Sequence, residues 1–218
     1  KITSEIKRPI SCIIGGSKIS TKIGLIKNLT LKLDNLIFVG GMANNILRYK
    51  GFEIGKSLIE ENCNGTINDI FNHADLNSCK IYYPEDVSVG KEFNGFSKVK
   101  NLNELNDEDM ILDIGPKTIK KIKKIIENSK TVFWNGPAGY FENENFAIGS
   151  SEIAETIGIR TKGNYLYSVV GGGDTIAVIN KIGGLNNFNF VSTAGGAFLE
   201  YLEGKELPGI KALNSWQS

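Results

Sequence analysis

Residues 13–18 of the chain are Ile13-Ile14-Gly15-Gly16-Ser17-Lys18: the end of an apolar strand, a glycine pair and polar residues that can begin a helix. Runs that are apolar throughout are typical of strands buried on both faces, as in parallel sheets with helical crossovers. The sequence therefore predicts an α/β, three-layer, Rossmann-like domain with a mostly parallel six-stranded sheet. The same arrangement recurs in Phe38-Val39-Gly40-Gly41-Met42-Ala43, Leu112-Asp113-Ile114-Gly115-Pro116-Lys117, Phe133-Trp134-Asn135-Gly136-Pro137, Val169-Val170-Gly171-Gly172-Gly173-Asp174-Thr175 and Val191-Ser192-Thr193-Ala194-Gly195-Gly196.

The loops after these strands are expected to meet at one edge of the sheet. Right-handed crossovers make all the strands point the same way, and open α/β sheets bind ligands at the edge where such loops gather. Glycines let the backbone approach a ligand closely, and helix N-termini offer N–H groups to anions. The repeated pattern therefore predicts a phosphate-binding crevice.

Periodic apolar residues predict the helices that cover this sheet. The region after the second strand differs, because short β-like runs are broken there by Pro84, Gly90 and Gly95. We expect a strand over 80–83 and then a small antiparallel flap around 84–100. No linker is evident, so residues 1–218 are expected to form one domain that folds alone. The predicted helices cover residues 18–29, 57–74, 117–127, 145–157, 174–182 and 196–203.

Composition excludes several classes of protein. The chain has 218 residues, is 41% hydrophobic and 22% charged, and has a formal net charge of +1. These values are ordinary for a globular protein and favour neither nucleic-acid nor membrane-surface binding. No apolar run approaches the roughly 20 residues of a membrane span. We expect a cytoplasmic monomer, with no nucleic-acid or membrane partner, that is part of a longer protein because it starts at Lys1.

The cysteines and the histidine carry no recognisable metal or redox motif. Cys12, Cys63 and Cys79 lack CxxC spacing, so we expect reduced thiols. His73 has no ligand partner nearby in the sequence and is expected at the surface.

Two common phosphate-binding fingerprints are missing. The sequence contains no GxxxxGK[ST] loop and no GxGxxG loop. Both patterns place glycines where the backbone must wrap a phosphate chain, so their absence disfavours Walker-type NTPases and NAD-dependent dehydrogenases.

The loops instead carry lysines and an acidic residue. Lys18 and Lys22 are four residues apart, which on a helix places both ammonium groups on one face near its N-terminus, where they suit phosphates. The alternative is two solvated lysines. Gly171-Gly172-Gly173 can form an anion nest, and Asp174 can be either a ligand for hydrated Mg²⁺ or an ordinary helix cap.

Taken together, the motifs resemble those of phosphoglycerate kinase. The resemblance rests on Gly15 through Lys22, Gly40-Gly41-Met42-Ala43, Leu112 through Pro116, Trp134 through Glu142, Gly171 through Thr175, and Ser192 through Gly204 followed by Leu207-Pro208-Gly209. These blocks occur in the family's order over nearly the whole chain, but they match only its C-terminal, nucleotide-binding half. The resemblance implies reversible phosphoryl transfer between 1,3-bisphosphoglycerate and ADP, with Mg²⁺, to give 3-phosphoglycerate and ATP.

The resemblance also implies roles for individual residues. Lys18 would stabilise the phosphoryl group during transfer, and Lys22 would hold the nucleotide phosphates. Asp174 would take the metal, Asn135 and Thr175 would contact phosphates, and Glu142 would contact the ribose. The implied catalytic backbone N–H groups are those of Gly172, Gly173, Gly195 and Gly196. The other implied nucleotide-binding residues are Gly16, Gly40, Gly41, Ile111, Leu112, Pro137, Tyr140 and Gly171.

Two positions depart from the family pattern and two functions stay open. Ile111 stands where the family has a glycine against the adenine, and Ala194 replaces a glycine of the last loop. The chain is either the nucleotide-binding part of a kinase or a nucleotide-binding module without transferase activity. Its three arginines, Arg8, Arg48 and Arg160, are scattered and form no site for phosphoglycerate. We therefore expect the chain alone to bind nucleotide without catalysing transfer.

Overall fold

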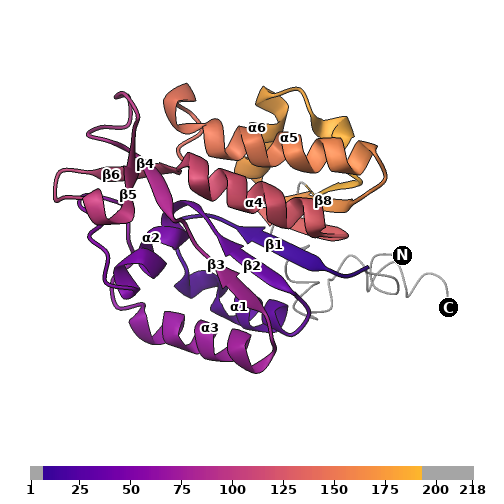
Figure 1. The fold of residues 1–218 in the computed structure, drawn as a ribbon, viewed down its shortest axis with the longest axis horizontal. Coiled ribbons are helices and arrows are strands. Elements are labelled where there is room, and N and C mark those ends of the chain that lie inside the picture. Colours follow the sequence, from indigo (N-terminus) through magenta and orange to yellow (C-terminus); the bar gives the residue numbers. More distant parts are fainter. Residues whose placement is uncertain (1–6, 193–218) are drawn as a thin grey trace, which may run out of the picture.

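The computed structural model describes residues 7–192, and its centre is a six-stranded parallel sheet (Figure 1). The strand order is β3-β2-β1-β7-β8-β9, and each neighbouring pair is parallel. The predicted parallel sheet is confirmed. Its strands are β1 Ile10–Ile14, β2 Asn35–Phe38, β3 Lys80–Tyr82, β7 Thr131–Asn135, β8 Tyr167–Gly171 and β9 Phe190–Ser192.

Helices cover both faces of the sheet, which explains why its strands are apolar throughout. Successive residues of a strand point to opposite faces, and in β1 Cys12 and Ile14 belong to one apolar cluster whereas Ile13 belongs to another. The first cluster packs under α1 Ile23–Thr30, α2 Gly40–Tyr49 and α3 Asn64–Leu76. The second packs under α4 Pro116–Asn128, α5 Ile148–Lys162 and α6 Gly173–Lys181, the upper layer in Figure 1.

A second, three-stranded sheet lies beside the first and corrects one expectation. In the order β5-β4-β6, it comprises β4 Asp86–Gly90, β5 Lys98–Asn101 and β6 Met110–Ile114, with antiparallel pairing throughout. The predicted flap is therefore real, but the run ending in Ile114 belongs to it. The sixth parallel strand is β3 instead. An apolar run does not reveal its pairing partner. Here β6 pairs with β4, although residues 91–109 separate the two strands in the chain.

Helix boundaries were predicted less well than strands. The prediction of one helix over 57–74 is wrong at its start, since α3 begins at Asn64. Asn62 has a φ of 60°, and the Ser57 hydroxyl accepts the N–H of Ile111 at 2.8 Å, so polar contacts hold residues 57–63 away from a helix. The predicted helix at 196–203 lies outside the described residues. Short 3₁₀ turns are η1 Ser20–Lys22, η2 Leu102–Glu104, η3 Glu144–Phe146 and η4 Leu185–Asn187.

The chain order reverses between β1 and β7, and glycines let the two following loops meet there. The Gly15 N–H donates to the Asn135 carbonyl at 2.8 Å. A Cβ on Gly15 would lie 2.4 Å from the Pro137 carbonyl oxygen, and Gly136 has a φ of +99°. Only glycine fits either position. This reversal is the point where doubly wound sheets bind ligands.

The three cysteines are buried and not disulfide-bonded, in line with the expected thiols. Burial raises the pKa of the Cys12 thiol to about 12. His73 does not lie simply at the surface as expected. It is half-buried on α3, because its helix packs against the sheet. None of the helices found between residues 7 and 192 combines the length and apolarity needed to cross a membrane.

Candidate functional site

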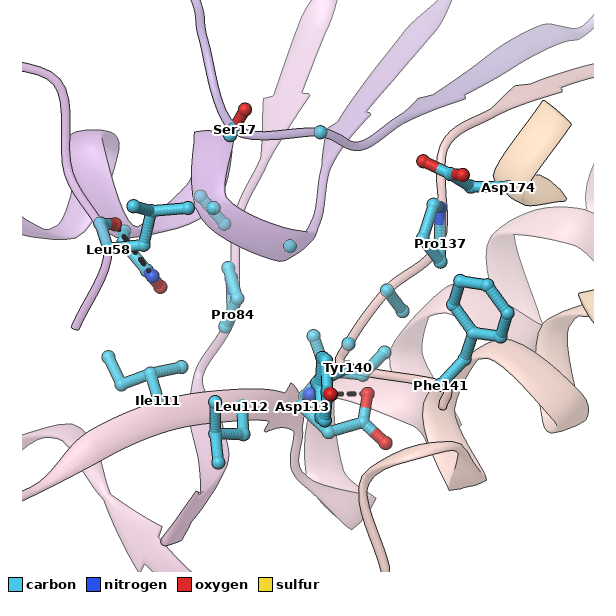
Figure 2. A pocket seen from close by; sticks show the side chains of 18 of the residues that line it. Ser17, Leu58, Pro84, Ile111, Leu112, Asp113, Pro137, Tyr140, Phe141 and Asp174 are labelled. Atoms are coloured by element: carbon cyan, nitrogen blue, oxygen red, sulfur yellow. Dashed lines mark hydrogen bonds between the residues drawn. The ribbon is translucent and has the colours of Figure 1, made fainter. Parts of the chain in front are cut away.

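A cleft opens where the loops after β1, β2 and β7 face the small sheet (Figure 2). Apolar side chains line one end of it: Leu58, Pro84, Ile111 and Leu112. Towards the other end lie Pro137 and the carboxylate of Asp174. The cleft therefore has an apolar end suited to a flat ring and a polar end close to a helix N-terminus.

The apolar end is held together by backbone contacts between the small sheet and the loop after β7. The Tyr140 N–H donates to the Leu112 carbonyl at 2.7 Å, and the Tyr140 ring lies 4.9 Å from that of Phe93, tilted by 57°. Ile111 is half-buried and lines the same end of the cleft. Its side chain thus occupies space that a glycine would leave open.

The polar end contains a partly buried lysine. The Lys22 ammonium donates to Asn135 Oδ1 at 3.1 Å and to the Gly15 carbonyl at 3.3 Å. The amide nitrogen of Asn135 in turn donates to the Gly171 carbonyl at 2.8 Å. Burial lowers the pKa of Lys22, and the Asp174 carboxylate opposes that effect. A bound anion would stabilise the charged form of such a partly desolvated lysine.

The N-terminus of α6 faces this lysine. Gly172 is the N-cap residue, with a φ of 96° and no side-chain hydrogen bond to the helix, so the amides of the first turn have no side-chain cap. Thr175 is fully buried, and its hydroxyl accepts the Gly136 N–H at 2.7 Å. Asp174 is exposed in the first turn. A helix N-terminus without a cap is a binding site for anions.

The predicted pairing of Lys18 and Lys22 on one helical face is wrong. Lys18 precedes the 3₁₀ turn η1, and Lys22 is the N-cap of α1 with a φ of −116°. Lys18 is exposed whereas Lys22 points inward. The amides of Ile19 and Ser20 already donate to the Glu60 carboxylate, at 2.8 and 3.0 Å. This helix start therefore does not offer those two N–H groups to a phosphate.

The structure gathers most of the residues implied by the resemblance. Those that line the cleft are Gly16, Gly40, Gly41, Ile111, Leu112, Pro137, Tyr140, Glu142 and Asp174. The others that converge around Lys22 and the α6 N-terminus are Asn135, Gly171, Gly172, Gly173 and Thr175. Lys18 does not line the cleft. Gly195, Gly196 and Ala194 lie outside the described residues.

Several cleft residues were not predicted as site residues, although Ser17 and Phe141 lie within the quoted motifs. They include Ser17, Asn44, Leu58, Pro84, Phe93 and Phe141. Asn44 donates its amide to the Leu58 carbonyl at 3.1 Å, the bond dashed beside Leu58 in Figure 2. Leu58 was expected to lie within a helix, and Phe93 within the flap. Both reach the cleft only through tertiary contacts.

Asp113 also lines the cleft, and a signal for it was present: an acidic residue within an apolar strand. Its carboxylate accepts the N–H groups of Gly149 at 2.7 Å and Ile114 at 2.8 Å. Burial nevertheless raises its pKa from 3.8 to about 7. Gly139 packs directly over it, since a Cβ there would lie 2.6 Å from Asp113 Oδ1. Asp113 therefore ties the start of α5 to the end of β6, with Gly139 packed against its carboxylate.

Asp174 suits a magnesium ion as a single protein ligand, whereas the described residues form no cluster of several ligands for it. Within residues 7–192, no group of three or more His, Cys, Asp or Glu residues could hold a metal ion. Asp174 is a single exposed carboxylate beside the α6 N-terminus. Mg²⁺ typically keeps several waters and binds through one or two carboxylates together with substrate phosphates. The donor set therefore suits a metal that arrives with a nucleotide.

Comparisons with known proteins agree with this geometry. The family model for phosphoglycerate kinase matches residues 1–205. The chain is 44% identical over 216 residues to the phosphoglycerate kinase of Novosphingobium aromaticivorans, covering 98% of this chain and 55% of that protein. The corresponding values for the Zymomonas mobilis enzyme are 45% over 209 residues, 95% and 53%.

A solved structure shows the same correspondence. Phosphoglycerate kinase from Coxiella burnetii superposes with a TM-score of 0.90 at 39% identity, covering 99% of this chain and 55% of that one. The chain thus spans about half the length of the relatives it matches. With a family model that covers almost the whole sequence and relatives this similar, the chain belongs to the phosphoglycerate kinase family.

Proposed function

We propose that this chain is the nucleotide-binding half of a glycolytic, cytoplasmic and monomeric phosphoglycerate kinase, and that it binds Mg²⁺ with ADP or ATP. One observation carries the proposal: the cleft joins an apolar slot to the uncapped N-terminus of α6, with Lys22 alongside. An adenine ring fits the slot beside Leu112 and Tyr140. The phosphates then extend towards Lys22 and Gly172–Asp174.

The residues of the cleft would act by position and charge. Lys22 would neutralise the nucleotide phosphates, and the amides at the start of α6 would donate to them. Lys18, which lies outside the cleft, would meet the phosphoryl group as it moves between the two substrates. Asp174 would hold Mg²⁺, which supplies further neutralisation of phosphate charge. Glu142, exposed at the rim of the cleft, would accept hydrogen bonds from the ribose.

We propose that a second domain supplies the phosphoglycerate site. None of the arginines of this chain lines the cleft, and each has a partner elsewhere: Arg8 with Asp34, Arg48 with Glu61, and Arg160 with the Glu127 carbonyl. The described residues thus offer no cluster of arginines for the carboxylate and phosphate of phosphoglycerate. A native mass roughly double the 23.9 kDa of this chain would be expected for the two-domain enzyme.

Calorimetry on this chain tests the nucleotide site. We expect Mg²⁺–ADP to bind more tightly than NAD, because the loops lack the dinucleotide fingerprint. Tighter binding of NAD would overturn the proposal.

A coupled assay on the full-length protein with 1,3-bisphosphoglycerate and ADP tests the reaction. Formation of ATP supports the kinase. Tight ADP binding without turnover would favour the alternative, a nucleotide-binding module.

A further inference from the structure

Two buried asparagines on α2 hold the segment that follows this helix. The Asn44 amide donates to the Leu58 carbonyl at 3.1 Å, and Asn45 Oδ1 accepts the Glu60 N–H at 2.7 Å. Asn44 is 2% exposed and Asn45 is 1% exposed. Buried amides with such partners fix the backbone they contact, because breaking the bonds would leave polar groups without water. The backbone of Glu60 is therefore anchored to α2.

The side chain of Glu60 extends from this anchor to the loop that carries Lys18. One carboxylate oxygen accepts the N–H groups of Ile19 and Ser20, at 2.8 and 3.0 Å. The other accepts the Ser20 hydroxyl. Ile19 is the N-cap of η1 and offers no side-chain cap of its own. Glu60 thus supplies, from 40 residues away in the chain, the cap that this turn lacks.

The charge of Glu60 suits this contact at neutral pH. The Ser20 hydroxyl and the Ser20 and Ile19 amides lower the pKa of its carboxyl group, and the Lys18 ammonium adds a smaller effect in the same direction. The ionised carboxylate accepts all three hydrogen bonds, and charge-assisted bonds of this kind are stronger than neutral ones.

The same contacts join two glycine loops of the cleft. Asn45 also donates to the Gly41 carbonyl at 3.0 Å, and the Met42 N–H donates to the Gly16 carbonyl at 2.7 Å. Hydrogen bonds therefore connect the first glycine loop to α2, α2 to Glu60, and Glu60 to residues 19–20 of the same loop. A shift of Glu60 would move the segment between the two lysines.

We infer that Glu60 is a positioning residue for the phosphate end of the site: it fixes residues 18–22, which carry Lys18 and Lys22. This inference rests on the proposed function, because those lysines matter only if phosphates bind beside them. If Glu60 positions the lysines, its removal should weaken phosphate binding, which is the opposite of what its charge alone would do. A negative charge near the site should weaken phosphate binding, so its removal alone should strengthen that binding or leave it unchanged.

Three variants of this chain separate the two effects. Glu60→Ala removes the charge and the hydrogen bonds. Glu60→Gln removes the charge but keeps the bonds, since its carbonyl can accept both N–H groups and its amide can donate to the Ser20 hydroxyl. Glu61→Ala removes the neighbouring charge, which pairs with Arg48 at 3.1 Å on the surface.

Each variant is titrated calorimetrically with Mg²⁺–ADP and with adenosine. We expect Glu60→Ala to weaken ADP binding by roughly 3- to 30-fold, the range for loss of a helix cap, with adenosine affinity unchanged. Glu60→Gln and Glu61→Ala should bind both ligands at least as tightly as the parent chain. In amide exchange followed by NMR, Ile19 and Ser20 should lose protection in Glu60→Ala only.

Other results would overturn the inference. If Glu60→Ala behaves like Glu61→Ala, or if ADP and adenosine weaken equally, Glu60 does not position the lysines. If Glu60→Ala does not fold, Ser20→Ala gives the answer, because it removes one of the three bonds from an exposed residue. A selective but smaller loss of ADP affinity is then expected, and no loss would refute the role. If the parent chain binds neither ligand, the proposed function fails and the inference falls with it.

Discussion

Replacing Lys22 with methionine should separate the effect of the Lys22 charge on the stability of the fold from its effect on nucleotide affinity. Methionine has similar length and no charge. In the structure the Lys22 ammonium lies 3.1 Å from Asn135 Oδ1 and 3.3 Å from the Gly15 carbonyl, and burial lowers its pKa. A lowered pKa in the folded state means that the charged form is held at some expense of stability at neutral pH.

The expected magnitudes follow from these contacts. Loss of two hydrogen bonds to neutral acceptors destabilises by about 1–3 kcal/mol, and removal of a desolvated charge offsets part of that. The free energy of unfolding should therefore fall by less than about 1–3 kcal/mol. A hydrogen bond between Lys22 and a phosphate contributes about 1.5–3 kcal/mol, so affinity for Mg²⁺–ADP should fall by about 10- to 150-fold. Adenosine has no phosphate and should bind as before.

Calorimetric titration with ADP and adenosine, together with urea unfolding, measures both effects. Lys27→Met is the matched control, because Lys27 lies on α1, whose N-cap is Lys22, and pairs with Asp69 at 2.8 Å on the surface. It should change ADP affinity little and stability by less than about 1 kcal/mol. If Lys22→Met and Lys27→Met reduce ADP affinity equally, Lys22 does not contact phosphate and only the overall charge matters.

Three further predictions concern other residues of the cleft. Glu142→Ala should weaken adenosine and ADP by the same factor in calorimetry, because its proposed contact is the ribose; a loss confined to ADP would refute that contact. Asp113 has a folded-state pKa of about 7 against 3.8 unfolded, so stability should fall as pH rises between those values, by at most about 1.4 kcal/mol per pH unit. Urea midpoints at pH 5 and pH 8 should show that Asp113→Asn flattens this dependence, whereas parallel curves for variant and parent would contradict the burial argument. In a two-domain enzyme made by joining this chain to the amino-terminal half of a relative, Lys18→Ala should lower kcat by on the order of 10²–10³ with little change in the KM for nucleotide, and near-normal turnover would exclude a catalytic role.

The sheet could be predicted from sequence because its signals are local. In β1, β2, β7 and β8, an apolar run followed by glycines marks both a buried strand and the loop after it. The helix predicted over 117–127 was equally clear, since Ile119, Ile122 and Ile126 follow the helical period, and all three are buried in α4. The choice of β6 as a parallel strand failed because the same local signal suits both sheets. Only pairing with β4 distinguishes them, and pairing is not a property of one segment.

The arrangement of the polar end of the cleft could not be predicted, although most of its residues were. Spacing placed Lys18 and Lys22 on one helical face, and that inference assumes that the helix begins before Lys18. Capping of Ile19 and Ser20 by Glu60 instead makes residues 20–22 a 3₁₀ turn, so that Lys22 turns inward and Lys18 stays exposed. No helix-start pattern could reveal a cap that comes from 40 residues further along the chain.

The same reasoning explains why the motifs identified the residues of the site although the predicted arrangement of its lysines was wrong. Asn135 and Thr175 are predicted to contact phosphates, and in the structure their side chains also hold the loops: Asn135 bonds Gly171 and Lys22, and Thr175 bonds Gly136. Each contact joins elements that follow different strands and meet only at the chain reversal. Residues that arrange a site and residues that touch its ligand lie in the same motifs, because both must be at the ends of the same strands. A motif therefore locates the site, and the hydrogen bonds show which of its residues also hold the loops.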